Sequence, residues 1–219
     1  MPAHDTIAAR VAEMPAGLPE EFATVFAAEQ AQLDATGRPD GVLAPGAEMP
    51  DGELLDVDGQ PTSLRQQRGD GVTVVVFYRG AWCPYCNIAL KAYQNVLVPA
   101  LTDRGVGLIA ISPQRPDGSL GMRDKHALSY VVLSDPGNQI AAKLGILTAP
   151  EAAVVETQGA LGLDLAEVNA DGTRILPMPA AAIVDADGVL RWIDVHPNYA
   201  TRSEPADILA ALSAIGVDA

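Results

Sequence analysis

Short, strongly apolar runs alternate along the chain with segments whose apolar residues follow helical spacing. Three runs, at 72–77, 106–111 and 181–185, are strand-sized and rich in β-branched or small apolar residues. Such runs are typical of strands buried on both faces, as in the parallel part of a sheet. Briefer runs at 54–57 and 131–133 add two shorter strands. The alternation predicts an α/β fold.

The clearest helix signal begins at Pro19 and ends near Gly37. Proline suits the first helical position, and the acids Glu20 and Glu21 complement the helix dipole. The apolar stripe of this helix consists of Phe22, Val25, Phe26 and Leu33. Further helices are expected at 87–97, 117–128, 138–144 and 204–215. Pro99 falls within the apolar pattern after residue 87 and should kink or restart that helix.

Turn signals divide the rest of the chain. The pairs Asp58-Gly59 and Asp187-Gly188 each separate two apolar runs and predict β-hairpins. We expect residues 1–40 to form an N-terminal arm and helix, with 1–18 a loose arm, and residues 41–219 to form one domain. An irregular segment at about 148–176, with one helix near 150–156, reads as an insertion. Insertions over a site commonly act as lids or interfaces.

Composition excludes several classes of function. The 219-residue chain (22.8 kDa) has a formal net charge of -14, which argues against nucleic acids and anionic membranes as partners. Its first residues lack a basic start and an apolar core, so no secretory signal is expected. The apolar runs are far shorter than the ~20 residues of a membrane span. We therefore expect a soluble, cytoplasmic protein.

The chain contains only two cysteines, Cys83 and Cys86. In a reducing cytosol such a pair is more often catalytic or metal-binding than a structural disulfide. The histidines, His4, His126 and His196, are scattered and show no metal-ligand spacing, so no metal is expected and we assign them no function. A C-x-x-C between a buried strand and a helix is a redox signature. It predicts a thioredoxin-like fold, a central mixed sheet with helices on both faces, plus the N-terminal helix.

Proline between the cysteines sets their place on the helix. Pro84 suits the first helical position, which puts Cys83 at the N-cap and Cys86 in the first turn. Free backbone N–H groups and the helix dipole favour a thiolate there. We expect Cys83 to be the more exposed, attacking thiolate and Cys86 the more buried, resolving thiol.

Neighbours of the motif are candidates for supporting roles. Arg79 precedes Cys83 by four residues and could stabilise a thiolate; the alternative is a solvated arginine at a strand end. We expect Trp82 to pack beside the site and Tyr85 to contact substrate or lie at the surface.

Two later positions are candidates for substrate binding. Gln114 follows a strand at the carboxyl edge of the sheet, where ligands collect, and could hydrogen-bond substrate or serve the loop. Met178-Pro179 precedes the strand at 181–185. A cis-proline at this point of a thioredoxin-like fold faces the cysteines; an ordinary trans proline at a strand entry is an equal alternative.

Motifs along the chain carry a resemblance to a known family. They are Phe77-Tyr78-Arg79-Gly80-Ala81-Trp82-Cys83-Pro84-Tyr85-Cys86-Asn87, Ile111-Ser112-Pro113-Gln114, Leu133-Ser134-Asp135 and Leu176-Pro177-Met178-Pro179. From about residue 44 onward the chain resembles the peroxiredoxin-like branch of the alkyl hydroperoxide reductase/thiol-specific antioxidant family. The resemblance implies a thioredoxin fold and thiol-dependent reduction of hydroperoxides, with electrons from thioredoxin or a similar thiol donor.

At the site itself the sequence departs from peroxiredoxins. These carry P-x-x-x-T-x-x-C after a similar Phe-Tyr pair, and that pattern falls on Arg79, Cys83 and Cys86. The family's later arginine falls on Pro179, so the threonine and arginine that activate peroxide are expected to be missing. In this register Cys86 attacks first, whereas the helix-cap argument favours Cys83. Both orders stay open, with Cys83 preferred.

Three hypotheses follow. The first is an antioxidant enzyme that reduces hydroperoxides through Cys83 and Cys86, cycling via an intramolecular disulfide. The second is a thioredoxin- or glutaredoxin-like protein disulfide oxidoreductase, which would explain both departures. The third is a non-catalytic thioredoxin-like adaptor. No cofactor is expected; a thiol donor such as thioredoxin or glutathione would supply electrons, and the N-terminal helix would allow a homodimer.

Overall fold

A seven-stranded mixed sheet forms the centre of the computed structural model, which describes residues 6–15 and 17–218. Its spatial order is β2 (Pro61–Ser63), β1 (Glu53–Leu55), β5 (Val131–Ser134), β4 (Gly107–Ser112), β3 (Thr73–Phe77), β8 (Ala180–Val184) and β9 (Leu190–Val195). The three central strands β3, β4 and β5 are parallel, and the other pairs are antiparallel. The predicted mixed sheet and both hairpins are confirmed.

Strand directions bring several chain segments to one edge of the sheet. β8 runs antiparallel to β3, and β9 antiparallel to β8, so β9 runs the same way as β3. The segments that follow β3, β4 and β9 therefore leave the sheet at the same edge. This edge holds the loop with both cysteines.

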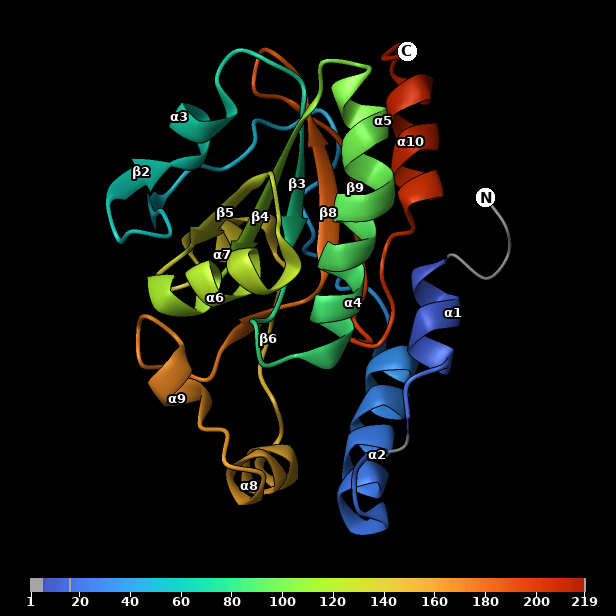
Figure 1. The fold of residues 1–219 in the computed structure, drawn as a ribbon, viewed down its shortest axis with the longest axis vertical. Helices are drawn as coiled ribbons and strands as arrows, with labels where there is room; N and C mark the ends of the chain where they lie inside the picture. The colour runs from blue at the N-terminus through green and yellow to red at the C-terminus, as the bar shows by residue number, and fades with distance from the viewer. Residues whose placement is uncertain (1–5, 16, 219) are drawn as a thin grey trace.

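Alternate residues of the strands serve two hydrophobic cores. Val74 and Val76 of β3 face the core that contains the cysteines, whereas Val75 and Phe77 face the opposite one. The cysteine-side core is covered by α1 (Ile7–Ala12), α4 (Pro84–Ala92), α5 (Val98–Thr102), α6 (Pro116–His126) and α10 (Pro205–Ala214). Helices α3 (Leu64–Arg68) and α7 (Gln139–Leu144) cover the other core. Figure 1 shows α4, α5 and α10 together on one side of the sheet.

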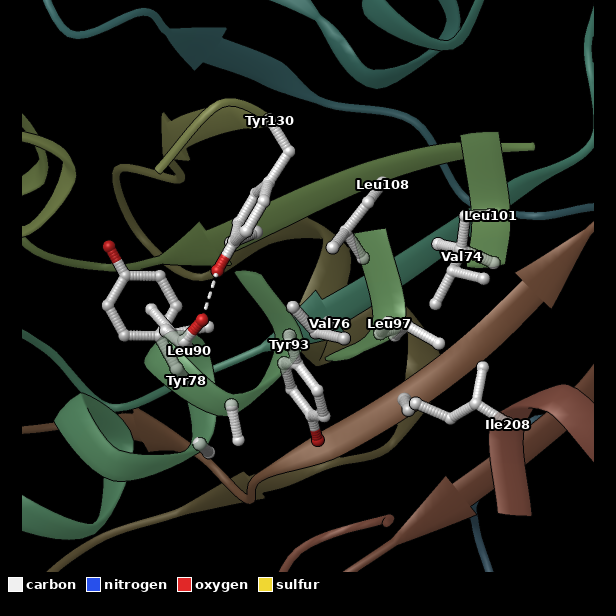
Figure 2. Close-up of a cluster of buried hydrophobic side chains, with 14 of the residues drawn as sticks. Val74, Val76, Tyr78, Leu90, Tyr93, Leu97, Leu101, Leu108, Tyr130 and Ile208 are labelled. Atoms are coloured by element: carbon white, nitrogen blue, oxygen red, sulfur yellow. Dashed lines mark hydrogen bonds between the residues drawn. The ribbon is translucent and has the colours of Figure 1, made fainter. Parts of the chain in front are cut away.

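The helix after the cysteines is interrupted just before Pro99, as the sequence predicted. A π-helical turn, η2 (Tyr93–Leu97), joins α4 to α5, and Pro99 lies in the first turn of α5. Proline lacks the N–H that would continue the hydrogen-bond ladder, so the helix changes its winding just before it. Figure 2 shows Tyr78, Tyr93 and Tyr130 around this helix, with the Tyr130 hydroxyl donating to the Leu90 carbonyl at 3.0 Å.

The N-terminal segment is more ordered than its composition suggests. Residues 7–12 form α1, and Ile7 is buried in the cysteine-side core with 1% exposure. The expectation of a loose arm over 1–18 is wrong for this stretch; residues 1–5 and 16 lie outside the described part. The reason is a long-range contact, because the Glu204 carboxylate accepts hydrogen bonds from the N–H groups of Ile7 and Ala8, each at 2.8 Å. The helix predicted after Pro19 is α2 (Glu20–Thr36).

The irregular segment after residue 148 is an excursion closed by a two-stranded ribbon. Strands β6 (Leu147–Thr148) and β7 (Leu176–Pro177) pair at its base, and α8 (Ala152–Ala160) and α9 (Leu165–Val168) lie between them. α8 packs against α2, and Gln32 donates to Glu151 at 2.7 Å. Figure 1 shows α2 and α8 projecting together from the sheet. Within the described residues, no helix combines the length and apolar character needed to cross a bilayer.

Candidate redox site

Both cysteines lie where β3 gives way to α4. Cys83 is the N-cap of α4, Pro84 occupies the first helical position, and Cys86 falls in the first turn, as expected. Both are free thiols, and both are buried, at 1% and 0% exposure. Cys83 was expected to be the more exposed of the two, but it is almost as buried as Cys86, because both belong to the cysteine-side core.

An arginine distant in sequence contacts the inner cysteine. Nη2 of Arg202 donates to Cys86 Sγ at 3.0 Å, across 116 residues of sequence. Arg202 also donates to the carbonyls of Tyr199 and Thr201 and is only 9% exposed. The family's later arginine falls on Pro179 in this sequence, but the fold brings a guanidinium to Cys86 from another position, Arg202. Motif alignment missed Arg202 because it lies in the loop after β9, outside every recognised motif.

Arg79 occupies an aromatic enclosure at the same edge. Its guanidinium carbon lies 3.9 Å from the ring centroid of Tyr199 and 5.0 Å from that of Trp82, distances typical of cation–π contacts. Arg79 is 5% exposed, so its alternative as a solvated arginine is excluded. Trp82 packs beside the site as expected. The charges of two buried guanidinium groups, Arg79 and Arg202, thus act on both cysteines.

The two thiols have different pKa values. Burial alone would raise the pKa of Cys86, but the hydrogen bond from Cys83 and the charge of Arg202 hold this pKa well below its usual value. Burial raises the pKa of Cys83, and its hydrogen bond to Cys86 raises it further. The geometry therefore favours a Cys86 thiolate that accepts a hydrogen bond from a protonated Cys83. This is the reverse of the order that the helix-cap argument preferred.

Gln114 shapes the loop before the cysteines. Its Oε1 accepts from the Ala81 N–H at 2.8 Å, and its Nε2 donates to the Tyr78 hydroxyl at 2.9 Å. With 2% exposure and both polar ends engaged, Gln114 positions the loop; a contact with substrate stays a prediction. Gly80 has φ +150°, and a Cβ there would lie 2.4 Å from Trp82 Nε1. Only glycine allows the indole this close.

Asn87 ties the same loop from the helix side. Its Nδ2 donates to the carbonyls of Ala81 and Cys83, both at 2.8 Å. Its Oδ1 lies 2.9 Å from Lys125 Nζ and 2.8 Å from His126 Nε2, both in the last turn of α6. His126, to which the sequence assigned no function, therefore supports the amide that holds the N-cap.

A small cavity lies behind Cys86. Its volume of about 10 Å³ is just enough for one water molecule, and Cys86, Arg202, Tyr78 and Tyr93 line it with apolar neighbours. Burial raises the pKa of Tyr78 to about 12, so this hydroxyl stays protonated at neutral pH. The space beside the sulfur suits a very small polar molecule.

The other predicted residues have no hydrogen bond to either sulfur among those the described residues form. Met178 belongs to the opposite core, so the structure does not bring it to the cysteines. Pro179 precedes β8, whose first residue pairs with Phe77, and its peptide bond is trans, since the described residues contain no cis bond. Tyr85 is half-buried, with its ring centroid 6.1 Å from that of Tyr199 and its hydroxyl accepting from Gln30 at 3.4 Å. Across the described residues, no group of His, Cys, Asp and Glu is placed to hold a metal.

Sequence comparisons find similarity to curated proteins of two kinds. It is 33% identical over 103 residues to "Putative peroxiredoxin" of Mycobacterium tuberculosis, a match that covers 47% of this chain and 64% of the relative. It is 26% identical over 115 residues to the thiol-disulfide oxidoreductase ResA of Bacillus anthracis, covering 52% and 65%. The chain thus spans just under two thirds of the length of these curated relatives.

Solved structures share the fold. Reduced Prx3 from Vibrio vulnificus, crystallised in complex with H2O2, matches with a TM-score of 0.63 at 19% identity, covering 78% of this chain and 99% of that one. Peroxidoxin BcpB from Mycobacterium tuberculosis matches with a TM-score of 0.59 at 20% identity, covering 79% and 98%. Residues 45–193, most of the chain, match the AhpC/TSA family. On this match the chain belongs to the AhpC/TSA family, and its fold is the thioredoxin-like fold of the peroxiredoxins.

Proposed function

We propose that the protein is a thiol-dependent peroxidase in which Cys86 attacks the peroxide and Cys83 resolves the product. The observation that carries the proposal is the 3.0 Å contact between Arg202 Nη2 and Cys86 Sγ. A guanidinium at this distance stabilises a thiolate and offers further N–H donors to an oxygen bound beside the sulfur. Family membership supports the same activity.

The chemistry balances with the groups present. The Cys86 thiolate attacks one peroxide oxygen, the O–O bond breaks, and the leaving oxygen takes a proton as water or an alcohol. The Cys86 sulfenic acid is then attacked by the Cys83 sulfur, which loses its proton while hydroxide leaves, and a disulfide forms. A thiol donor, such as thioredoxin or glutathione, restores both thiols with two electrons. No metal or organic cofactor takes part.

The positions of the two cysteines support this order. In the peroxiredoxin register Cys83 takes the place of the threonine and Cys86 that of the peroxidatic cysteine. A thiol at position 83 can donate a hydrogen bond to the thiolate, as a hydroxyl would, and can also resolve the sulfenic acid. Arg202 supplies the positive charge that peroxiredoxins provide with an arginine at the position of Pro179.

Burial supports peroxide over protein disulfides as substrate. Sulfurs at 1% and 0% exposure are out of reach of a disulfide on another protein unless the loop opens, whereas hydrogen peroxide, with only two heavy atoms, needs a much smaller opening to reach them. The structural neighbour from Vibrio vulnificus was crystallised with H2O2. Disulfide exchange is the second candidate, favoured by the C-x-x-C itself and by the similarity to ResA.

Reduction of the disulfide requires a partner. The proposal includes a thioredoxin-like reductant, a homodimer formed through the N-terminal helix, and a cytoplasmic location, where a C-x-x-C is suited to redox cycling. The non-catalytic adaptor is the least favoured alternative, because two buried guanidinium groups around the cysteines serve no purpose in a purely structural pair.

The test is stopped-flow oxidation of the reduced protein by hydrogen peroxide and by an organic hydroperoxide. Cys86→Ser should lose the first oxidation step completely. Cys83→Ser should keep it and stop at a sulfenic acid, which a dimedone-type probe traps. Equal first-step rates for Cys86→Ser and the unmodified protein would assign the attack to Cys83.

Insulin reduction by dithiothreitol, run in parallel, separates the remaining candidates. If peroxide reacts no faster than with a free thiol while insulin is reduced, the protein is a disulfide oxidoreductase. If neither substrate reacts, the adaptor hypothesis stands instead.

A further inference from the structure

Arg202 reaches Cys86 from a loop rather than from a helix or strand. It lies between β9 and α10, where no regular ladder of hydrogen bonds fixes the backbone. The stabilisation that Arg202 gives the Cys86 thiolate depends on their separation of 3.0 Å, because the attraction between opposite charges weakens with distance. Holding a long arginine side chain in one conformation also costs rotamer entropy. Neighbouring groups must therefore hold the loop.

Side chains on both sides of Arg202 contact a joined pair of residues, Asp194 and His196. Before it, Thr201 Oγ1 lies 2.8 Å from His196 Nδ1. After it, Ser203 Oγ donates to Asp194 Oδ2 at 2.7 Å. The two contacted residues are themselves joined, because His196 Nε2 lies 2.9 Å from the same Asp194 oxygen.

Asp194 and His196 are both hydrogen-bonded to the sheet or its entry segment. Asp194 belongs to β9 and pairs with Ala181 of β8, and the N–H of His196 donates to the Pro179 carbonyl at 2.8 Å. A second tie comes from the cysteine helix, where the Tyr93 hydroxyl donates to the Ser203 carbonyl at 2.8 Å. The loop around Arg202 is thus fixed to the sheet on one side and to η2 on the other.

The three polar side chains are not a hydrolytic triad. Ser203 Oγ lies 3.4 Å from His196 Nε2 and donates instead to Asp194, and that same histidine nitrogen faces the aspartate. A serine nucleophile needs one imidazole nitrogen as base while the carboxylate holds the other. Ser203 is also only 2% exposed. A role in supporting the loop fits these contacts.

Resting on the proposed peroxidase function, we propose that Asp194 and His196 are positioning residues for the reaction. They clamp the chain on both sides of Arg202 and thereby hold its guanidinium against the Cys86 sulfur. Neither residue touches substrate. Their effect on the reaction passes entirely through Arg202.

The test measures the Cys86 thiolate directly. In a Cys83→Ser background a single thiol titrates, and its ultraviolet thiolate absorbance is followed against pH. Arg202→Met should raise the pKa of Cys86 by about 1–3. Asp194→Asn and His196→Ala should each raise it in the same direction and lower the thiolate fraction about tenfold at a pH below the new value. The peroxide rate should fall in parallel and recover at higher pH.

The sign of the change separates positioning from a direct charge effect. Removing the negative charge of Asp194 without moving Arg202 would lower the pKa of Cys86, whereas loss of the clamp raises it. In the Arg202→Met background, Asp194→Asn should no longer raise this pKa. A pKa that falls, or that rises equally in both backgrounds, overturns the proposal.

A variant in the same hairpin controls for lost stability. Asp185 accepts from the Val189 N–H at 2.8 Å in the turn between β8 and β9, far along the strands from Arg202. Asp185→Asn should lower the unfolding midpoint and leave the Cys86 titration unchanged. If Asp194→Asn behaves in the same way, the pair is merely structural.

Two further outcomes are distinguishable. If Asp194→Asn does not fold, Ser203→Ala removes one hydrogen bond of the clamp and should give a smaller rise of the same sign; no rise overturns the proposal. The titration needs no peroxide. If the variants shift the Cys86 pKa but the protein has no peroxidase activity, the positioning role of Asp194 and His196 is retained and the proposed function is rejected.

Discussion

At the scale of single residues, the two sulfurs differ in their charged neighbours rather than in their exposure. Both are buried, and both lie at the start of α4, Cys83 at the N-cap and Cys86 in the first turn, so exposure does not distinguish them. Arg202 donates a hydrogen bond to Cys86 Sγ. Because a buried thiolate needs a nearby positive charge and a hydrogen-bond donor, the thiolate form is favoured at Cys86, with the Cys83 thiol as donor.

The lowered pKa of Cys86 predicts how the peroxide rate depends on pH. A thiol with an ordinary pKa of about 8.5 loses thiolate as the pH falls below that value. With its pKa held well below this range, Cys86 stays a thiolate, so the second-order rate constant should be flat between about pH 8.5 and 6.5. Stopped-flow oxidation of Cys83→Ser at several pH values measures it. A steady tenfold fall per pH unit across this range would show an ordinary thiol.

At the scale of elements, tight backbone contacts fix how the helices meet the connecting segments. Gly145 ends α7 with φ +73°, in the left-handed region. A Cβ at this position would lie 2.2 Å from the carbonyl oxygen of Gly41, a backbone atom that cannot rotate away. The α7 terminus and the connector before β1 therefore approach each other as closely as two backbones can.

Replacing this glycine should be costly. Gly145→Ala adds left-handed strain of about 1–2 kcal/mol and a backbone clash of about 1–3 kcal/mol, so the free energy of unfolding should fall by about 3 kcal/mol. Gly59→Ala is the matched control, since Gly59 has φ +76° with nothing within 4 Å of the added Cβ. It should lose only the strain. Urea denaturation of both variants gives the difference; equal losses would mean that the contact at Gly41 yields without cost.

At the scale of the whole molecule, the N-terminal segment is fastened to the C-terminal part of the chain. Ile7 packs in the cysteine-side core and α1 packs against α4. Glu204 binds the N–H groups at the start of α1 and also caps α10. The first described helix thus joins the same network as the loop that carries Arg202.

Truncating Ile7 should therefore destabilise the entire domain. Ile7→Ala removes a side chain with 1% exposure and should lower the free energy of unfolding by about 2–5 kcal/mol. Val11→Ala, at a half-buried position of the same helix, should cost less. Chemical denaturation monitored by tryptophan fluorescence compares them. A loss for Ile7→Ala no larger than for Val11→Ala would mean that α1 frays before the core unfolds.

Much of the fold follows from the sequence because its causes are local. The run at 72–77 is apolar enough to mark β3, Asp-Gly pairs mark both hairpins, and Pro99 marks the break before α5. Each signal acts through neighbours a few residues away. The placement of Cys83 and Cys86 at a helix start is predicted in the same way, from Pro84.

The chemistry of the site was decided by tertiary structure. The proposed order of attack by the cysteines, the burial of Arg79, the contact of His126 with Asn87 and the folding of residues 7–12 into α1 all depend on contacts between segments far apart in sequence. The sheet explains why. Because β9 runs in the same direction as β3, the loop after β9 meets the loop after β3 at one edge, and Arg202 arrives at Cys86. Periodicity and spacing reveal which residues form a strand, but only the packed sheet determines which loops become neighbours and where the thiolate lies.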